Sequence, residues 1–317
     1  MCVYLGIDVG SVTTKIAALN EQNELVANCY GRTEGKPVVV IQRLLRELVE
    51  KLPEGVEIAG VGTTGSGRLL AGAMVGADVI KNEITAHAVA ASHYFPDTRT
   101  ILEIGGQDSK IIILRDGIVV DFAMNTVCAA GTGSFLDQQA FRLKIKIDEF
   151  GPIALQSRSP VRIAGRCTVF AESDMIHKQQ MGHSVPDILY GLCEALARNY
   201  LNNLGLGKEI LAPVVFQGGV AANQGMIRAF EEALKCEILV PKHHHIMGAI
   251  GAALLAHEHA ELSDRPTSFR GFGISEMSYS TTSFDCKGCS NRCEIVEIKA
   301  GHEMLARWGG RCGKWDM

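Results

Sequence analysis

Two cysteines attract attention because each directly precedes a helix-like stretch. Cys128 lies in NTVCAAGTGSFLDQQA, and Cys167 lies in GRCTVFAESDMIHKQQ. A helix N-terminus carries free N–H donors and a partial positive charge, which stabilise a thiolate and any anionic group that it binds. In a reducing compartment such cysteines serve metal binding or redox chemistry more often than disulfides. The alternative is that both thiols are buried or incidental.

Two related glycine-containing segments predict phosphate binding. They are LGIDVGSVTTKIAAL at the start and ILEIGGQDSKIIIL near residue 101. Glycine lets the backbone approach an anion closely, and neighbouring N–H groups and hydroxyls, such as those of Ser11, Thr13 and Thr14, can point at phosphate oxygens. A repeat of domain size indicates two similar domains. Matched positions lie 95 residues apart: Asp8 with Glu103, Gly10 with Gly105, Thr14 with Ser109, and Lys15 with Lys110.

Acids and a lysine complete these segments. Asp8 and Asp108 are hard oxygen ligands suited to Mg²⁺, which they can hold directly or through its waters. Lys15 either supplies a point charge to the phosphates or lies on the returning strand and faces solvent. One such hairpin is weak evidence for nucleotide binding, whereas two related copies are much stronger.

A third glycine site lies in VVFQGGVAANQGMIRAF. The apolar strand at 214–216 meets Gly218–Gly219, and Ala222–Asn223 opens an amphipathic helix. A Gly-Gly turn lets a planar ring lie flat against the backbone, so we predict an adenosine pocket, with ordinary strand–helix packing as the alternative. His243–His245 is interpreted as a solvated or base-contacting loop. The helix that follows is rich in Gly and Ala and is expected to pack closely on a domain.

The last 32 residues hold four of the ten cysteines. Their spacing is C-x2-C-x3-C, followed after eighteen residues by the fourth, and such a compact set is typical of a tetrahedral Zn²⁺ site or an iron–sulfur cluster. The spacing does not choose between the two, and unliganded thiols are the alternative. EIVEIKAG alternates as a strand does, whereas SDRPTSFRGFGISEMSYSTTSF is interpreted as a connecting segment. The candidate ligands are Cys286, Cys289, Cys293 and Cys312.

Composition limits the class of protein. The 317-residue chain is 47% hydrophobic and has a net charge of −4, so it lacks the basic character of a nucleic-acid-binding protein. MCVYLGIDVG runs straight into a strand pattern without a basic and apolar leader, and no apolar run approaches the length of a membrane span. We therefore expect a cytoplasmic protein with two domains and a small appendage. The cysteines expected to be small buried apolar residues are Cys2, Cys29, Cys193 and Cys236.

The order of these features resembles the superfamily of actin, sugar kinases and heat-shock chaperones. More narrowly, IDVGSVTTK, NEITAHA, EIGGQDSK, the two cysteine segments and GGVAANQG resemble the activator family of 2-hydroxyacyl-CoA dehydratases, which includes the ATPase subunits of benzoyl-CoA reductases. The resemblance covers roughly residues 3–260 and implies an α/β fold of two ribonuclease-H-like domains with ATP in the cleft between them. The expected parts are a first domain (1–98), a second domain (99–245), a helix packing back on the first domain (246–262), and a linker with a Cys-rich metal-binding tail (263–317).

The resemblance implies that Cys128 and Cys167 of each subunit in a homodimer jointly hold one 4Fe–4S cluster. Four thiolates are the usual ligand set, and twofold symmetry supplies them from two per chain. The expected catalytic residues are Asp8, Gln107, Asp108 and Glu83, although Glu83 and His87 lie one helical turn apart and pairing with each other is the alternative. The expected nucleotide-binding residues are Gly10, Ser11, Thr13, Thr14, Lys15, Gly105, Gly106, Gly131, Gly218, Gly219, Ala222 and Asn223.

The implied activity is ATP-driven electron transfer. A ferredoxin or flavodoxin would reduce the cluster, and hydrolysis of Mg-ATP would deliver the electron at lower potential to an iron–sulfur dehydratase or reductase, such as a 2-hydroxyacyl-CoA dehydratase or a double-cubane cluster protein. A drop of several hundred millivolts requires on the order of 10 kcal/mol, which nucleotide hydrolysis can provide. Two alternatives remain open: a sugar or N-acetylglucosamine kinase on the same fold, and a non-redox regulatory ATPase whose cysteines hold only zinc. The Cys-rich tail at 263–317 is a feature that the short members of the activator family lack.

Overall fold

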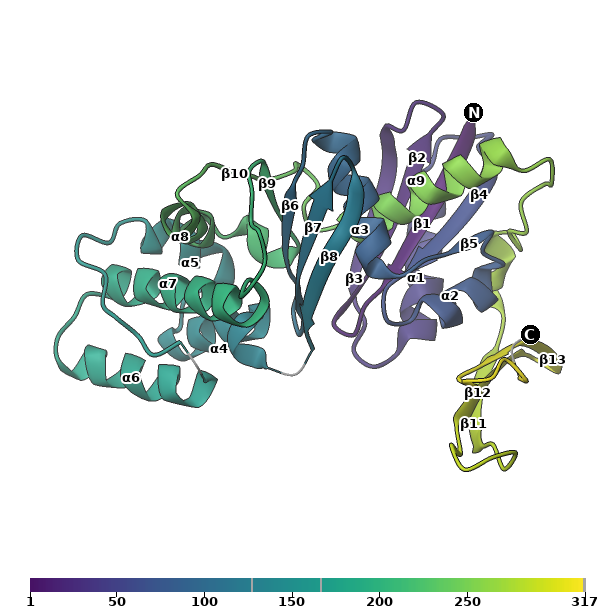
Figure 1. The fold of residues 1–317 in the computed structure, drawn as a ribbon. Coiled ribbons are helices and arrows are strands. Elements are labelled where there is room, and N and C mark those ends of the chain that lie inside the picture. Colours follow the sequence, from purple (N-terminus) through teal and green to yellow (C-terminus); the bar gives the residue numbers. More distant parts are fainter. Residues whose placement is uncertain (127, 166, 316–317) are drawn as a thin grey trace. The chain divides into compact units, whose positions relative to one another are not determined.

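The structure is a computed structural model that describes residues 1–126, 128–165 and 167–315. It divides into two compact units (Figure 1). Unit 1 comprises Met1–His87 together with Gly248–Met317, and unit 2 is the continuous segment Ala88–Met247. Unit 1 is therefore built from the two ends of the chain.

A five-stranded sheet with the order β3-β2-β1-β4-β5 forms the centre of unit 1. β1 pairs antiparallel with β2 and parallel with β4. Alternate residues of β1 point to opposite faces of the sheet, and Val3, Leu5 and Ile7 enter one hydrophobic core. The strands are β1 (Cys2–Val9), β2 (Thr13–Asn20), β3 (Leu25–Arg32), β4 (Glu57–Thr64) and β5 (Val79–Ile80).

Helices cover both faces of this sheet (Figure 1). α1 (Pro37–Lys51) and α2 (Arg68–Val75) bury their apolar residues in the same core as Val3, Leu5 and Ile7. α9 (Met247–Leu262) lies on the opposite face, where His257 stacks on Tyr4 with ring centroids 3.9 Å apart. α3 (Glu83–Tyr94) begins in unit 1 and ends in unit 2.

Close contact between α9 and the sheet depends on glycine. A methyl carbon added to Gly6 would lie 1.9 Å from the Ala249 carbonyl oxygen, and one added to Gly62 would lie 2.1 Å from the Ala252 carbonyl oxygen. Both opposing atoms are backbone and cannot rotate away. The Gly- and Ala-rich helix therefore packs directly on the strand backbone, as its composition predicts.

We expect Gly62→Ala to destabilise the protein by about 3 kcal/mol, because overpacking against backbone forces the helix away from the sheet. Urea unfolding followed by circular dichroism measures the change. Gly273→Ala is the control, since no atom lies within 4 Å of a methyl carbon at that position. Equal stability of the two variants would contradict direct packing of α9 on β4.

Unit 2 repeats the sheet topology of unit 1. Its order, β10-β9-β6-β7-β8, is that of unit 1 read from the other edge, with β6 antiparallel to β7 and parallel to β9. The corresponding hairpins share their register, because Asp8 pairs with Lys15 and Glu103 pairs with Lys110. The internal repeat is thus a structural repeat. The strands are β6 (Thr100–Ile104), β7 (Ser109–Arg115), β8 (Ile118–Asn125), β9 (Val214–Gln217) and β10 (Ile238–Leu239).

The helical layer of unit 2 centres on α7 (Val185–Leu204), whose N-cap Ser184 accepts a hydrogen bond from the Asp187 N–H. α7 buries Tyr200 against Phe230, which also packs edge-on against Phe216 of β9. This aromatic contact joins helix and sheet in one core. The other helices are the 3₁₀ turns η1 (Ala129–Gly131) and η2 (Gly219–Ala222), and α4 (Gly133–Leu143), α5 (Ile147–Ala154), α6 (Thr168–Gln180) and α8 (Gln224–Leu234).

The C-terminal tail forms a three-stranded antiparallel sheet with the order β11-β12-β13. η3 (Phe272–Glu276) precedes β11 (Tyr279–Asp285), β12 (Glu294–Ala300) and β13 (Glu303–Trp308). The predicted strand in EIVEIKAG is confirmed as β12. The predicted connecting segment is shorter than expected, because its last residues pair with β12 as strand β11.

Side chains of α1 hydrogen-bond to the segment that precedes the tail sheet. From α1, the Gln42 amide donates to the Met277 carbonyl at 2.8 Å, and the Arg46 guanidinium donates to the Ser275 carbonyl at 2.9 Å. Ile298 of β12 is fully buried in the core of unit 1. None of the described helices is both long and apolar enough to cross a bilayer.

Candidate functional site

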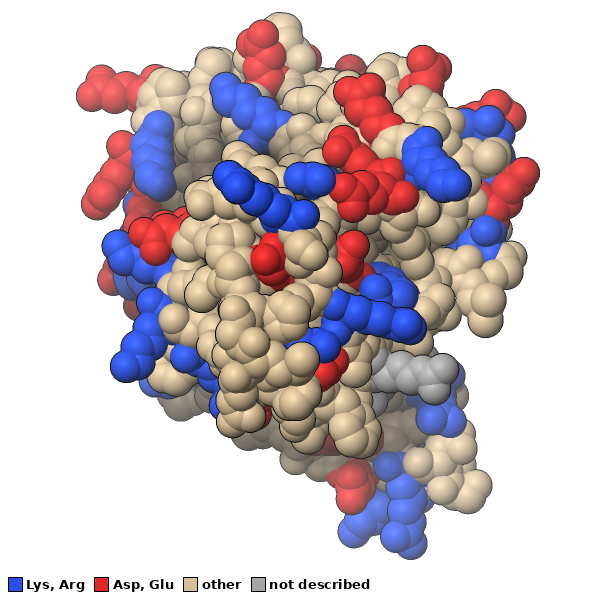
Figure 2. Space-filling view, turned by 90° about the vertical axis from the view of Figure 1, so that its left-hand side faces the viewer, with Lys and Arg blue, Asp and Glu red and all other residues tan. Residues whose placement is uncertain are grey.

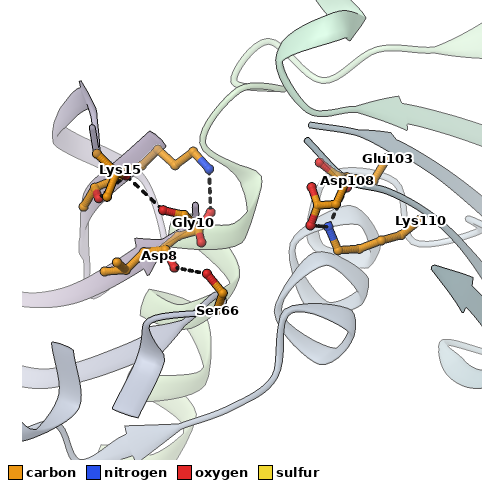
Figure 3. A network of polar contacts seen from close by, with 10 residues as sticks. Asp8, Gly10, Lys15, Ser66, Glu103, Asp108 and Lys110 are labelled. Carbon is orange, nitrogen blue, oxygen red and sulfur yellow. Dashed lines mark hydrogen bonds and ion pairs between the residues drawn. The ribbon is translucent and has the colours of Figure 1, made fainter. Parts of the chain in front are cut away.

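The first hairpin places a buried carboxylate beside a lysine (Figure 3). Asp8 ends β1, and its Oδ2 lies 3.0 Å from the Lys15 Nζ on the returning strand β2. The two side chains are only 8% and 16% exposed, so Lys15 does not face open solvent. Gly10 tightens the turn by donating its N–H to the Thr13 carbonyl at 2.9 Å.

The second hairpin carries one lysine between two carboxylates. Lys110 Nζ lies 3.0 Å from Glu103 Oε2 and 2.8 Å from Asp108 Oδ2 (Figure 3). Lys110 is 2% exposed, and Tyr200 donates its hydroxyl to the Lys110 carbonyl. The hairpin thus places two carboxyl groups around one amine. Asp108, with a third of its side chain exposed, is the carboxylate best able to contact a cation.

A buried hydroxyl without a hydrogen-bond partner among the described residues lies beside the first hairpin, on β4, and another lies within the second. These are Thr64 Oγ1, on the strand residue paired with Asp8, and Ser109 Oγ, at the start of β7. A buried hydroxyl that lacks a partner costs free energy unless a ligand or water supplies one. Both positions therefore suit a polar ligand.

The Gly218–Gly219 turn lies over the end of β6. Gly218 has φ +92°, and a methyl carbon there would lie 2.3 Å from the Ile104 carbonyl oxygen, so only glycine fits. His244 fastens the turn from the other side: the Gly218 N–H donates to its carbonyl at 2.8 Å, and its Nδ1 lies 2.9 Å from the Gly218 oxygen. Asn223 caps α8 by accepting from the Met226 N–H. The helix predicted after the glycines is confirmed.

Cys128 lies in a loop closed by the side chain of Asn125. The Cys128 N–H donates to Asn125 Oδ1 at 2.9 Å, and Asn125 Nδ2 donates to the Cys128 carbonyl at 2.7 Å. Cys128 caps the short turn η1, and α4 begins only at Gly133. The predicted helix thus starts five residues after the cysteine, because Thr132 adopts an extended backbone between the two elements.

Cys167 is the N-cap residue of α6, as the sequence predicts. Polar side chains hold the approach to it: Asp174 accepts from the Ala164 N–H at 3.0 Å, and the Arg198 guanidinium donates to the Ile163 carbonyl at 2.7 Å. Asp187 accepts further bonds from residues 157–159. Hydrogen bonds from the Ser184 hydroxyl and this segment keep the pKa of the Asp187 carboxyl well below its usual range.

Asn199 of α7 joins the two cysteine loops. Its Nδ2 donates to the Gly165 carbonyl, two residues before Cys167, and its Oδ1 lies beside Gly131, three residues after Cys128. A methyl carbon on Gly131 would lie 3.2 Å from that oxygen. Asn199 is 5% exposed and its Oδ1 also accepts from Asn203 Nδ2 at 2.9 Å, so the amide is bonded to the Cys167 loop and lies next to the Cys128 loop.

We expect Asn199→Ala to loosen a cofactor held by the two cysteines, because it leaves the Gly165 carbonyl unpaired. An unsatisfied buried acceptor costs about 1–3 kcal/mol, which corresponds to roughly tenfold faster loss of iron to a chelator. Asn202→Ala, on the exposed side of the same helix, is the control. If both variants lose iron to the chelator at the same rate, Asn199 does not help to hold the cofactor.

A short hydrogen-bonded path links the turn of the second hairpin to the Cys128 segment. The first N–H groups of α4 donate to this loop: Gly133 to the Gly105 carbonyl at 2.8 Å, and Ser134 to the Gly106 carbonyl at 2.9 Å. The Ser134 hydroxyl also donates to the Gly106 carbonyl. A displacement of Gly105–Gly106 therefore acts directly on the start of α4.

Apolar side chains are exposed on the helices that follow the cysteines. Val169 and Phe170 of α6 are 65% and 67% exposed, and Phe141 of α4 is 82% exposed. Exposed apolar residues near a candidate site are typical of a surface that binds a protein.

The face drawn in Figure 2 carries positive and negative side chains interspersed, without a continuous basic surface.

The remaining predicted residues have simple placements. Gln107 is exposed at the tip of the second hairpin, and Glu83 is the first residue of α3. Cys29 and Cys193 are buried as expected, whereas Cys2 and Cys236 are only half-buried. Sequence reasoning interpreted His243–His245 as a solvated or base-contacting loop without its contact to Gly218, and it missed Asn199. The histidine run was a usable signal for His244; Asn199 had none, because its partners are distant in the sequence.

Within the described residues, no group of three or more His, Cys, Asp or Glu side chains is placed as a metal site. The four cysteines of the tail are among these residues: Cys286 is buried, Cys293 is half-buried, and Cys289 and Cys312 are exposed. A hydrogen bond from the Trp315 indole, followed by one from the Gly288 N–H, lowers the pKa of the Cys286 thiol.

Two units with one sheet topology, each carrying an acid–lysine pair on its first hairpin, form the fold found in actin-like ATPases and sugar kinases. A ROK family glucokinase from Streptomyces griseus shares that fold with a TM-score of 0.50 at 13% identity, covering 81% of this chain and 99% of the kinase. The chain belongs to the BadF/BadG/BcrA/BcrD ATPase family, whose model matches residues 5–256.

Several relatives are similar over nearly their whole length. The (R)-2-hydroxyglutaryl-CoA dehydratase activating ATPase of Acidaminococcus fermentans is 37% identical, with 82% of this chain and 99% of the relative covered. A component of the benzoyl-CoA reductase of Thauera aromatica is 28% identical, with 83% and 96% covered. The Clostridium difficile activator of 2-hydroxyisocaproyl-CoA dehydratase, solved with bound ADPNP, has a TM-score of 0.74 at 35% identity and covers 82% of this chain and 96% of that structure.

Proposed function

We propose that this protein is an ATP-hydrolysing activator that delivers a low-potential electron to an iron–sulfur dehydratase or reductase. Membership of the ATPase family and similarity to dehydratase activators support this assignment. The acceptor is a 2-hydroxyacyl-CoA dehydratase, a benzoyl-CoA reductase or a related enzyme such as a double-cubane cluster protein. Ferredoxin or flavodoxin is the proposed electron donor.

The two hairpins are proposed to bind Mg-ATP. The carboxylate oxygens of Asp8 and Asp108 fit a divalent cation, and the buried hydroxyls of Thr64 and Ser109 fit phosphate or a metal-bound water. Mg²⁺, when bound, neutralises charge that develops on the transferred phosphoryl group. Gly10 and Gly105 donate their N–H groups within the turns, to the carbonyls of Thr13 and Asp108, and as glycines they let the hairpin tips approach the phosphates closely. Gln107 and Glu83 are proposed to position the attacking water.

The glycine turn after β9 is proposed to receive the adenosine. Gly218 and Gly219 present bare backbone, which His244 holds in place from one side. A side chain at Gly218 is excluded by the backbone of β6. Besides the hairpin residues, the proposed nucleotide site includes Gly131, Gly219, Ala222 and Asn223.

Cys128 and Cys167 are proposed to hold one 4Fe–4S cluster shared by two subunits. Both thiols are half-buried, and the buried amide of Asn199 is bonded to the Cys167 loop and lies next to the Cys128 loop. Two cysteines per chain are half of the usual set of four thiolates, which favours a twofold arrangement. The cluster, when bound, supplies one-electron chemistry. The exposed Val169 and Phe170 are the proposed start of the dimer contact.

The observation that carries the proposal is the hydrogen-bonded junction between Gly105–Gly106 and the start of α4. It connects the loop expected to sense the γ-phosphate with the segment that contains Cys128. The carbonyls of Gly105 and Gly106 move with the loop, and the N–H groups of Gly133 and Ser134 follow them. Nucleotide turnover thereby acts on the cysteine loop.

Anaerobically purified protein tests the function. We expect a brown dimer with about four iron atoms per dimer, which hydrolyses ATP and, once reduced by dithionite, transfers electrons to a purified dehydratase only while ATP is hydrolysed. Absorbance of the oxidised and reduced cluster follows the transfer. A colourless, iron-free monomer would overturn the proposal, as would rapid phosphorylation of glucose or N-acetylglucosamine without electron transfer.

A further inference from the structure

The tail sheet brings its four cysteines to one end. Cys286 and Cys293 continue the β11–β12 ladder, because the Cys286 N–H donates to the Cys293 carbonyl at 2.8 Å directly beyond the pair Asp285–Glu294. Cys289 lies in the loop that joins them. The paired residues on antiparallel strands present their side chains on the same face.

The chain after β13 returns Cys312 to this end. β13 finishes at Trp308, which pairs with Val296 near the start of β12. The following Gly309 passes so close to Glu294 that a methyl carbon would lie 2.3 Å from its carbonyl oxygen. Three residues past Cys312, the Trp315 indole donates to Cys286 Sγ at 3.2 Å.

The sulfur of Cys286 is already surrounded by N–H donors. The Gly288 N–H donates to it at 3.4 Å, in addition to the Trp315 indole. N–H groups that converge on a sulfur, here one from the following loop and one from the end of the chain, support a metal-bound thiolate, because they orient it and stabilise its negative charge. Cys286 is 8% exposed, so this arrangement is built into the tail.

Little else holds this end of the tail together. Ile298 and its neighbours anchor the other end in unit 1, but near the cysteines only Ile295 is fully buried among the described residues. Phe284 contacts Trp315 edge-on at 5.1 Å and remains 36% exposed. With so small a core at this end, a structural metal is one of the cross-links that would stabilise it.

We propose that Cys286, Cys289, Cys293 and Cys312 bind one structural zinc ion. Tetrahedral zinc with Zn–S bonds of about 2.3 Å holds its sulfurs roughly 3.8 Å apart. Side chains of directly opposed strand residues, with Cβ atoms about 5 Å apart, reach that separation. The thiolates of a 4Fe–4S cluster bind different irons and lie further apart. Cys289 and Cys312 are exposed, and their side chains turn inward to complete the site.

This site is independent of the proposed electron transfer. The family model ends at residue 256, before the tail begins, and the matched relatives are covered almost completely without it. The tail can therefore bind zinc whether or not two subunits share a cluster.

Elemental analysis of the anaerobically purified full chain tests the proposal. We expect about one zinc per chain, lost in Cys286→Ser and in Cys293→Ser but retained in Cys236→Ser, a half-buried cysteine of unit 2. Iron content stays the same in all three. Trypsin provides a second readout, because Lys287, Arg292, Arg311 and Lys314 are exposed around the cysteines. Cleavage there is expected to accelerate at least severalfold in the two tail variants.

Three results would overturn the inference. The first is a wild-type protein without stoichiometric zinc. The second is iron that remains in Cys128→Ser but disappears in Cys286→Ser, which would assign a cluster to the tail. The third is a Cys286–Cys293 disulfide detected by mass spectrometry of the anaerobic protein. Zinc without any iron would support this inference and contradict the proposed electron transfer.

Discussion

Replacing Cys128 by serine is expected to reduce the iron content from about four per dimer to background and to abolish ATP-dependent electron transfer. Serine keeps the shape of the side chain but is a poor ligand for iron, and twofold symmetry removes two of the four ligands at once. ATP binding should change little, because the hairpins do not depend on the thiol. Iron analysis, visible absorbance and nucleotide-binding calorimetry measure the three quantities.

Cys236→Ser is the matched control for this experiment, since Cys236 is half-buried in the same unit but lies between α8 and β10. The tail zinc should also persist in Cys128→Ser. If the brown colour is retained at wild-type strength, Cys128 is no ligand. If colour and ATP binding disappear together, the variant has lost its fold, and Cys167→Ser becomes the decisive comparison.

Asp8→Asn is expected to slow ATP hydrolysis on the order of 10²- to 10³-fold while leaving the iron content unchanged. The carboxylate is proposed to hold the magnesium ion, and a metal's stabilisation of transition-state charge is worth several kcal/mol, with about 1.4 kcal/mol for each tenfold in rate. Asparagine preserves the size of the buried side chain and its contact with Lys15. Steady-state phosphate release over a range of Mg²⁺ concentrations measures the effect.

Asp97→Asn removes one carboxylate from an exposed position of unit 2 and should hydrolyse ATP at the wild-type rate. If Asp8→Asn still hydrolyses ATP at more than about a tenth of the wild-type rate, the loss is too small for a residue that binds the metal. Loss of the cluster with hydrolysis preserved would reverse the roles given to Asp8 and Cys128.

The repeated hairpins were the part of the fold most accessible from the sequence. Their chemistry recurs at a constant separation, and the structure gives both copies the same register, with Asp8 opposite Lys15 and Glu103 opposite Lys110. The Gly- and Ala-rich helix after residue 246 was also predictable, because small residues permit direct packing on strand backbone. The environment of Lys15 was not, since only the folded hairpin shows its contact with Asp8.

The residues that hydrogen-bond to the cysteine loops could not be predicted from the sequence. Asn199 occurs in a helix, more than 30 residues after Cys167, and only tertiary contacts bring its amide to Gly165 and Gly131. The extended Thr132 between η1 and α4 similarly reflects the hydrogen bonds that α4 makes to Gly105 and Gly106. The attachment of the tail through Gln42 and Arg46 has no local sequence signature, because it joins segments more than 200 residues apart.

The division of unit 1 between the two ends of the chain has a consequence for biosynthesis. During translation, the strands of its sheet leave the ribosome early, but the helix that covers Gly6 and Gly62 is made only after the whole of unit 2. Unit 2 is one continuous segment and can fold as soon as it emerges. The nascent N-terminal sheet must therefore wait with one apolar face uncovered, and it is the part of the molecule most dependent on a chaperone until synthesis is nearly complete.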